Sequence, residues 1–271
     1  MEQEKLKQQI RQTFDTICEG YDCPSLRFFN NAAAHLPAVF DLRGDERLLD
    51  VATGTGTPAL ALAAHLPRGA ITAVDFSGGM LAQAQKKAEA AGAENITFTE
   101  MDMTALQLEE GSFDGANCSF GLFFIQEMAQ TLAHIAGKVR PGGTLVTTHF
   151  LEGSFDPLAG CFLQRLERDY GVEIPPIGWQ RVGTEQLNRE LHQAAGLRDI
   201  RVERHQVGYP FVHAEQWWEV VWNAGYRGLL AGLDTAQLER FRREHLEEIA
   251  ALDEGEGIPL NIEVAITRAT R

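Results

Sequence analysis

Residues 48–57 have the sequence Leu48-Leu49-Asp50-Val51-Ala52-Thr53-Gly54-Thr55-Gly56-Thr57. A short apolar run ends in an acidic residue and a glycine turn, and Pro58 then opens an alanine- and leucine-rich segment that predicts a helix. The two glycines allow the backbone to pass close beneath a ligand, where a side chain would collide. The N-terminus of the helix behind them offers free N–H groups and a partial positive charge. The stretch therefore predicts a strand, a nucleotide-type binding loop and a helix, in that order.

The composition indicates a globular enzyme made of one large domain, with or without an appendage. The chain has 271 residues, of which 44% are hydrophobic and 23% are charged. Its net charge of −14 repels phosphate backbones and anionic lipid surfaces. We therefore expect no nucleic-acid partner, and a small-molecule substrate that is neutral or cationic.

The cysteines and the N-terminus predict the compartment. The four cysteines have no CxxC spacing and no neighbouring histidine cluster, which favours a reducing compartment and predicts no metal site. The first five residues are mostly charged or polar, and no apolar run approaches the length of a membrane span. A cytoplasmic protein is expected.

Strand and helix patterns alternate from about residue 43 to residue 150, which predicts a parallel sheet with crossover helices. Strands are expected at 47–51, 70–74, 95–99, 113–118, 144–150, 197–202 and 262–267. Helices are expected at 58–66, 79–91, 126–139 and 184–195. In an open α/β sheet, ligands bind at the carboxyl ends of the strands, so the glycine turn marks the expected site.

Three further features accompany the glycine turn. Asp75 ends the second predicted strand, Asp102 follows the third, and Pro141-Gly142-Gly143 precedes the fifth. Together with Asp50, they resemble the motifs of the class I S-adenosylmethionine-dependent methyltransferases, most of all the ubiquinone/menaquinone-biosynthesis C-methyltransferase type. The resemblance implies an α/β, Rossmann-like sheet of seven strands whose last strand is antiparallel, with S-adenosylmethionine as cofactor.

Two alternatives stay open at this point. The spacing Gly54-x-Gly56-x-x-Ala59 also satisfies the GxGxxA fingerprint of nicotinamide dehydrogenases, and both families place an acidic residue where Asp75 stands. The first alternative is therefore an NAD-dependent oxidoreductase. The second is a protein of the methyltransferase fold that binds the cofactor without transferring a methyl group. Asp50 and Asp102 favour the methyltransferase, since a dinucleotide fingerprint has no use for them.

The resemblance also implies roles for single residues. Asp75 would accept hydrogen bonds from both ribose hydroxyls, and Asp102 would accept one from the adenine amino group. Asp50 would act around the methionine amino group, and Tyr21 would cover the cofactor. The expected cofactor-binding residues are Tyr21, Asp50, Ala52, Thr53, Gly54, Gly56, Asp75, Phe76, Met80, Asp102, Met103 and Ser119.

The acceptor side departs from the family pattern. The quinone methyltransferases carry an Arg-Asn pair after the fourth strand, whereas this chain has Gly121-Leu122-Phe123-Phe124-Ile125. We therefore expect a small, largely apolar acceptor rather than a quinone. The residues expected to contact it are Phe123, Phe124, Trp218 and Trp222. The sequence does not separate O-, N- and C-methylation.

His149, at the end of the fifth predicted strand, is the candidate general base. An imidazole has a pKa near the working pH, and this strand end points to the correct edge of the sheet.

Two segments outside the sheet are expected to cover the site. Residues 1–42 form a helical arm whose apolar side chains recur at helical spacing, and residues 205–257 form a helical insertion before the last strand. The cofactor-binding domain then comprises 43–204 and 258–271. One helix of the insertion is expected to present Trp218, Val221, Trp222, Gly225 and Leu229 on one face, and Asp234 is expected to cap the next. A homodimer is compatible with the sequence.

Overall fold

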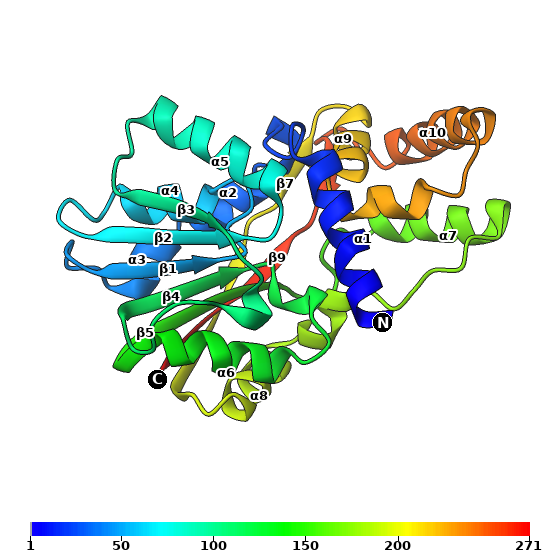
Figure 1. The fold of residues 1–271 in the computed structure, drawn as a ribbon. Helices are drawn as coiled ribbons and strands as arrows, with labels where there is room; N and C mark the ends of the chain where they lie inside the picture. Colours follow the sequence, from blue (N-terminus) through cyan, green and yellow to red (C-terminus); the bar gives the residue numbers. More distant parts are fainter. Residues whose placement is uncertain (1) are drawn as a thin grey trace.

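A seven-stranded sheet forms the centre of the molecule (Figure 1). The computed structural model describes residues 2–271, with side chains from Lys5 onward. The strands are β1 (Arg47–Val51), β2 (Ala70–Asp75), β3 (Ile96–Glu100), β4 (Phe113–Ser119), β5 (Val139–Phe150), β6 (Arg198–Gln206) and β9 (Glu263–Thr270). They lie in the order β3-β2-β1-β4-β5-β9-β6, and β9 is antiparallel to both of its neighbours. The sheet predicted from the sequence, with its antiparallel last strand, is confirmed.

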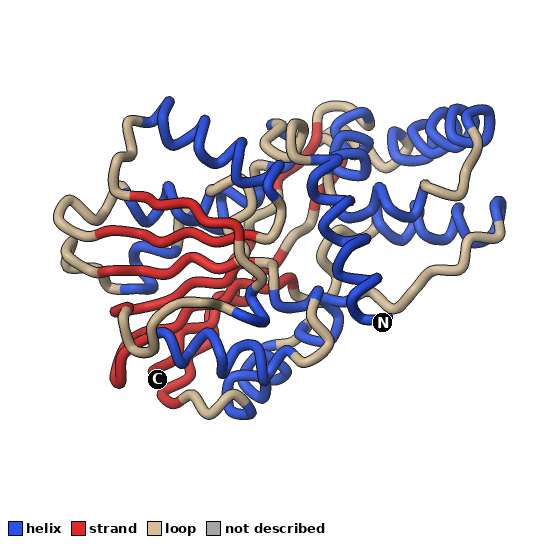
Figure 2. Tube along the Cα trace, in the orientation of Figure 1, coloured by secondary structure: helices blue, strands red, loops and turns tan. Residues whose placement is uncertain are grey.

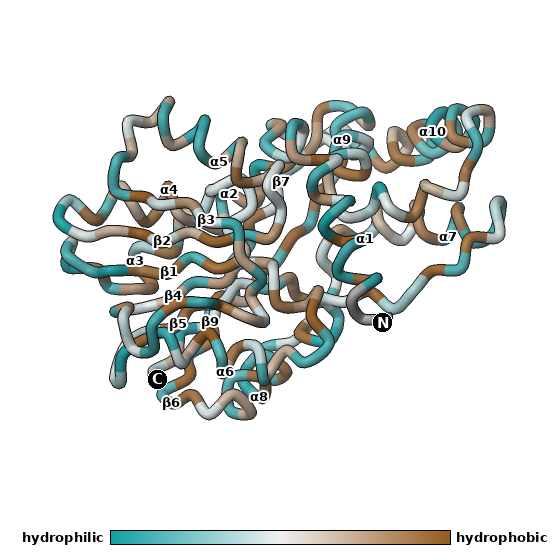
Figure 3. Tube along the Cα trace, viewed as in Figure 1, coloured by the Kyte–Doolittle hydropathy of each residue, from teal (hydrophilic) through white to brown (hydrophobic). Residues whose placement is uncertain are grey.

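Helices cover both faces of this sheet (Figure 2). On one face lie α2 (Phe28–Ala33), α3 (Leu36–Phe40), α4 (Thr57–Ala63) and α5 (Gly78–Ala91), and on the other lie α6 (Met128–Lys138) and α8 (Glu185–Ala194). The central strands are therefore buried on both sides, and Leu48, Leu49 and Val51 are at most 1% exposed. Hydrophobic residues follow the strands, whereas hydrophilic and hydrophobic residues alternate along α5, whose buried residues include Met80 and Leu81 (Figure 3). This packing holds the carboxyl ends of the strands in fixed positions.

Helix α1 (Glu2–Ile17) crosses the carboxyl ends of the strands (Figure 1). The Asp15 carboxylate accepts hydrogen bonds from the Ser77 hydroxyl at 2.5 Å and from the Gly79 N–H at 3.1 Å, which joins α1 to the first turn of α5. After α1, Asp22 accepts from the Thr55 hydroxyl at 2.9 Å and from the Lys87 ammonium at 2.6 Å. The N-terminal arm is thus attached directly to the glycine turn.

An outer lobe lies beyond the same edge of the sheet. It contains α7 (Leu158–Tyr170), α9 (Glu215–Asn223), the 3-10 helix η5 (Gly225–Leu230), α10 (Thr235–Ala250) and the strand pair β7 (Tyr209–Phe211) and β8 (Ile258–Leu260). The 3-10 helix η4 (Gly178–Val182) packs instead against β5 and α8. Phe162 of α7 packs edge-on against Trp217 and Phe241 of the insertion, with ring centroids 6.5 and 5.4 Å away. Helix α7 therefore belongs to the lobe, although the predicted insertion begins only at residue 205.

The predicted helix carrying both Trp218 and Leu229 is wrong. Helix α9 ends at Asn223, Ala224 has extended backbone (φ −131°, ψ −167°), and η5 follows. Gly225 and Gly228 explain the break, because glycine is the least favourable helix former after proline. The predicted cap at Asp234 is confirmed, because Asp234 forms a capping box with Gln237. At the two ends of α5, Ser77 accepts from the Met80 N–H and Gly92 lies in the left-handed region.

Candidate functional site

The glycine turn between β1 and α4 depends on three residues with positive φ. Ala52, Gly54 and Gly56 have φ values of 55°, 55° and 79°. A Cβ at Gly56 would lie 3.0 Å from the Ala84 Cβ, whereas a Cβ at Gly54 would meet no atom within 4 Å. Gly56 is therefore needed for packing, and the open space at Gly54 is a cradle that a side chain would fill.

Asp50, near the end of β1, stabilises this turn from the buried side. Its side chain is fully buried and accepts hydrogen bonds from the Thr53 hydroxyl at 2.5 Å and from the Asn117 amide at 2.7 Å. Burial raises the pKa of Asp50 to about 6, although these hydrogen bonds oppose the shift. Asp50 and Gly56 do not line the cavity described next, so the Asp50 side chain shapes the turn through its hydrogen bonds.

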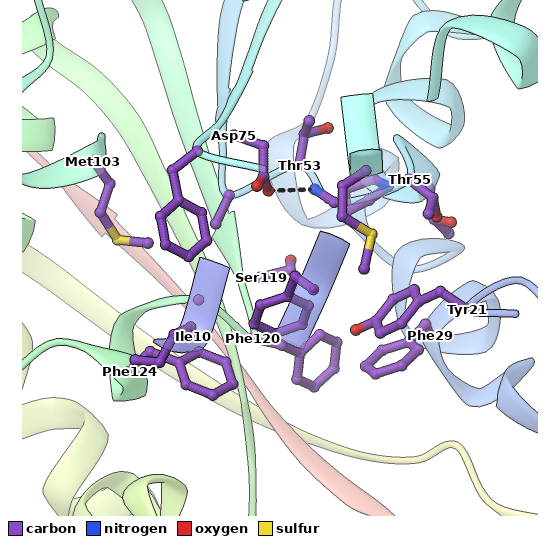
Figure 4. Close-up of a pocket in the computed structure, with 18 of the residues that line it drawn as sticks. Ile10, Tyr21, Phe29, Thr53, Thr55, Asp75, Met103, Ser119, Phe120 and Phe124 are labelled. Carbon is purple, nitrogen blue, oxygen red and sulfur yellow. Dashed lines mark hydrogen bonds between the residues drawn. The ribbon is translucent and has the colours of Figure 1, made fainter. Parts of the chain in front are cut away.

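Asp75 faces the open side of the turn. Its carboxylate accepts from the Gly54 N–H at 2.8 Å (Figure 4). It also accepts from the Ser77 N–H at 2.9 Å. Burial raises the pKa of Asp75 above its usual value, while these backbone donors act in the opposite direction. A carboxylate oxygen can accept a second hydrogen bond, so Asp75 retains capacity for a ligand.

A cavity, which we call the loop cavity, lies between the glycine turn and α1. Most of the expected cofactor residues line it: Tyr21, Ala52, Thr53, Gly54, Asp75, Phe76, Met80, Asp102, Met103 and Ser119. The sequence did not point to Lys7 and Ile10, which enter from α1, or to Phe29 from α2. The wall thus combines carboxylates at one end with apolar and sulfur-containing side chains around them.

A second cavity, the aromatic cavity, adjoins the loop cavity on the side of the outer lobe. It has a volume of about 310 Å³. Its wall includes Phe28, Phe123, Phe150, Phe155, Leu163, Trp179 and Tyr226, and no residue with a charged side chain lines it in the part of the chain that the structure describes. The cavity therefore suits an uncharged, apolar molecule.

Five side chains line both cavities, and we call them the aromatic boundary. They are Phe14, Tyr21, Phe29, Phe120 and Phe124. Figure 4 shows Tyr21, Phe29, Phe120 and Phe124 on the side of the loop cavity opposite Asp75. Tyr21 stacks on Phe29 with ring centroids 5.1 Å apart. Burial, with smaller contributions from Asp75 and Asp22, raises the pKa of the Tyr21 hydroxyl, which is therefore neutral at pH 7.

His149 is not placed to act as the general base. The Asn188 amide group donates to the carbonyls of Val182 and Thr184, which directs its Oδ1 to His149 Nδ1 at 2.6 Å. His149 Nδ1 therefore carries the proton, and Nε2 is buried without a hydrogen-bond partner. His149 is fully buried and lines neither cavity. The expectation of a base at this position is thus corrected.

The expected acceptor contacts divide into two groups. Phe123 and Phe124 line the aromatic cavity, whereas Trp218 and Trp222 do not. Trp218 stacks on Trp222 with centroids 6.1 Å apart, and the Arg227 guanidinium lies 4.3 Å from the Trp222 ring. The two tryptophans thus pack within the outer lobe.

Comparison with known proteins gives the family. A family model described as a methyltransferase domain matches residues 48–143. The ubiquinone/menaquinone biosynthesis C-methyltransferase UbiE of Bdellovibrio bacteriovorus is 36% identical over 196 residues, which cover 71% of this chain and 81% of that protein. The chain belongs to the class I S-adenosylmethionine-dependent methyltransferases. It is a methyltransferase that uses S-adenosylmethionine, and this membership decides against the NAD-dependent alternative.

Two further matches agree with this membership. A demethylmenaquinone methyltransferase of Thermus thermophilus is 35% identical over 127 residues, which cover 46% of this chain and 57% of that protein. Among solved structures, the YcgJ protein of Bacillus subtilis shares the fold with a TM-score of 0.60 and 17% identity, covering 89% of this chain and 98% of that one.

No helix within residues 2–271 is long and apolar enough to span a membrane. Among these residues no cluster of three or more His, Cys, Asp or Glu side chains could hold a metal ion.

Proposed function

We propose that this methyltransferase acts on a small, uncharged, largely apolar acceptor bound in the aromatic cavity. One observation carries the proposal: two cavities that differ in the charged side chains of their walls meet at the aromatic boundary. The loop cavity has the carboxylates of Asp75 and Asp102, whereas the aromatic cavity has no charged side chain among the described residues. The arrangement supports a polar cofactor on one side and an apolar acceptor on the other.

The residues of the loop cavity suit S-adenosylmethionine. Asp75 would accept hydrogen bonds from the ribose hydroxyls, and Asp102 would accept one from the adenine amino group. Phe76 and Met103 would pack on the adenine ring. The methionine portion would pass over the open backbone at Gly54, close to Ser119, whose hydroxyl is 3.1 Å from that of Thr148. The absence of a Cβ at Gly54 is the feature of the chain that supports this fit.

When bound, the sulfonium supplies a methyl group that is already strongly electrophilic. The aromatic boundary would exclude water and hold the acceptor in line with that methyl group, and the negative faces of its rings favour a cationic centre. Tyr21 offers a neutral hydroxyl at this point, and no stronger base lies among the residues shared by the two cavities. The favoured acceptor therefore has a nucleophilic electron pair in its uncharged form, as a neutral amine does.

A screen with radiolabelled S-adenosylmethionine tests the proposal. The panel would pair neutral aromatic amines, thiols and phenols with charged analogues of the same size, and would include a short-tailed demethylmenaquinol because relatives carry that name. We expect label transfer to the neutral apolar compounds and little to the charged ones. Transfer confined to tRNA, DNA, a protein or highly charged metabolites would contradict the assignment of the aromatic cavity.

A further inference from the structure

One wall of the aromatic cavity is made of two 3-10 helices that touch through their backbones. Gly178 begins η4, and a Cβ at this position would lie 2.7 Å from the carbonyl oxygen of Phe123 in η3 (Leu122–Phe124). That distance is shorter than real Cβ contacts, and the atom that a Cβ would meet is backbone. Any side chain at residue 178 would therefore force η3 and η4 apart.

Arg181, three residues further along η4, holds the same contact together. Its Nη2 donates to the carbonyls of Phe123 at 2.8 Å and Ile125 at 2.6 Å, and its Nη1 donates to the carbonyl of Gln126 at 3.1 Å. These carbonyls belong to the segment that follows β4. A planar guanidinium is well suited to fix several acceptors at once, which a lysine ammonium does less well.

The residues that these contacts position face the acceptor. Phe123 and Phe124 extend from η3 into the aromatic cavity, and Ile177 and Trp179 enter it from the η4 side. Phe124 also belongs to the aromatic boundary. The separation of η3 and η4 therefore determines how wide the cavity is next to the point of transfer.

We infer that Gly178 and Arg181 are specificity-determining positioning residues, which set the width of the acceptor cavity through the contact between η3 and η4. The inference rests on the proposed function, because it takes the aromatic cavity as the acceptor site. Neither residue touches the reacting atoms. Their effect passes through Phe123, Phe124 and Trp179.

The test compares matched substitutions with a neutral fluorescent probe, N-phenyl-1-naphthylamine, on the full chain. Gly178→Ala introduces the clash with Phe123, whereas Gly228→Ala adds the same methyl group to η5 at a position that lines neither cavity and meets no atom within 4 Å. We expect Gly178→Ala to weaken probe binding about tenfold, and Gly228→Ala to leave it within about twofold. Calorimetry should show S-adenosylmethionine affinity within about threefold in both variants, and thermal unfolding should show both to be folded.

Arg181 is tested in the same way. Arg181→Ala should weaken the probe about fivefold and Arg181→Lys should restore part of the loss. The control is Arg140→Ala. Arg140 lies at the start of β5 and donates to Asp114, whereas the cavity residue Phe150 lies at the other end of that strand, so this substitution is distant from the aromatic cavity. With an acceptor from the screen, Arg181→Ala should change the ratio of kcat/KM between bulky and slender acceptors, which a general loss of stability would not do.

Three outcomes distinguish a failure of the inference about Gly178 and Arg181 from a failure of the proposed function. If the unmodified protein binds the probe and both Gly178→Ala and Arg181→Ala bind it equally well, the inference is wrong and the proposed function stands. If probe and cofactor affinities fall together with the unfolding temperature, the two residues are structural only, which also overturns the inference. If the unmodified protein does not bind the probe, the acceptor cavity is wrongly assigned and both proposals fall.

Discussion

The Lys7 ammonium of α1 lies 2.7 Å from the Asp102 carboxylate, which follows β3. Asp102 also accepts from the backbone N–H and the hydroxyl of Thr104, at 2.7 and 2.8 Å. Burial alone would raise the pKa of Asp102, but the hydrogen bonds from Lys7 and Thr104 outweigh it and lower the pKa below its usual value. The carboxylate assigned to the adenine end is therefore ionised and directly joined to the arm that covers it.

Removal of the Lys7 ammonium should loosen this cover. We expect Lys7→Ala to weaken S-adenosylmethionine binding about threefold, as is typical of a partly exposed ion pair, and the difference from the unmodified protein should shrink at high salt. Calorimetry at two salt concentrations measures both effects. Lys5→Ala, an exposed lysine on the same helix, is the control, and an equal effect of the two substitutions would contradict the role given to Lys7.

Asp75→Ala should weaken cofactor binding far more. It removes the acceptor proposed for the ribose and also frees the N–H groups of Gly54 and Ser77. We expect a loss of about 1.5–3 kcal/mol, or about ten- to a hundredfold in Kd, by calorimetry. Asp45→Ala, an exposed carboxylate 4.0 Å from Arg68, is the control. Comparable losses in the two variants would mean that Asp75 does not bind the ribose. NADH should give no binding isotherm with the unmodified protein.

His149 should matter for acid stability rather than for catalysis. Burial lowers the pKa of His149 to about 4, so the unfolded state binds more protons between about pH 6.5 and pH 4. The stabilising contribution of His149 is complete above the pKa that it has in the unfolded state, about 6.5, and is lost as the pH falls through this range. We expect acidification from pH 7 to pH 5 to lower the free energy of unfolding by about 2 kcal/mol through His149 alone.

The variant His149→Gln isolates this contribution. Asp50 titrates with the opposite sign and His192 with the same sign, but both are present in variant and unmodified protein alike. Urea unfolding at pH 7 and pH 5 should show a smaller difference between the two pH values in the variant. The kcat of the variant should stay within about threefold. A hundredfold drop in kcat with unchanged cofactor affinity would restore His149 as the base.

Trp179 and Trp222 should differ in their effect on acceptor choice. Trp179 lines the aromatic cavity, whereas Trp222 packs against Trp218 and Arg227 outside it. We expect Trp179→Ala to shift kcat/KM at least about tenfold towards bulkier acceptors. Trp222→Ala should lower the unfolding temperature without changing that preference. The measurement is kcat/KM for acceptors of graded size. A change of acceptor preference in Trp222→Ala would contradict the placement of Trp222 outside the aromatic cavity.

The sequence was sufficient for the sheet and for most of the wall that faces the cofactor, because those features are local. The acidic and small residues at the ends of β1, β2 and β3 follow directly from strand periodicity and glycine chemistry. The bounds of β5 were less accurate. Val139, predicted to end a helix, begins the strand, and Pro141, Gly142 and Gly143 also belong to it, although they have the composition of a turn.

The acceptor side was harder to predict because it is assembled from segments distant in the chain. Phe29, Phe155, Trp179 and Tyr226 meet in one cavity, and no spacing in the sequence relates them. The helical stripe of Trp218 and Trp222 drew attention to the insertion, yet an amphipathic stripe shows only that a face is buried, and here it is buried within the lobe. The adjacent aromatic residues Phe28 and Phe29 were the signal in the sequence that could have indicated the second wall.

Helix α1 crosses the loop cavity and is fixed through Lys7 and Asp15, and the segment after it is fixed through Asp22. We therefore expect the incoming cofactor and the spent S-adenosylhomocysteine to pass α1, and each passage to require these contacts to separate. We expect the acceptor to enter along the aromatic cavity from the outer lobe. The acceptor and its methylated product would then exchange while α1 stays in place, whereas exchange of the cofactor would require α1 to move.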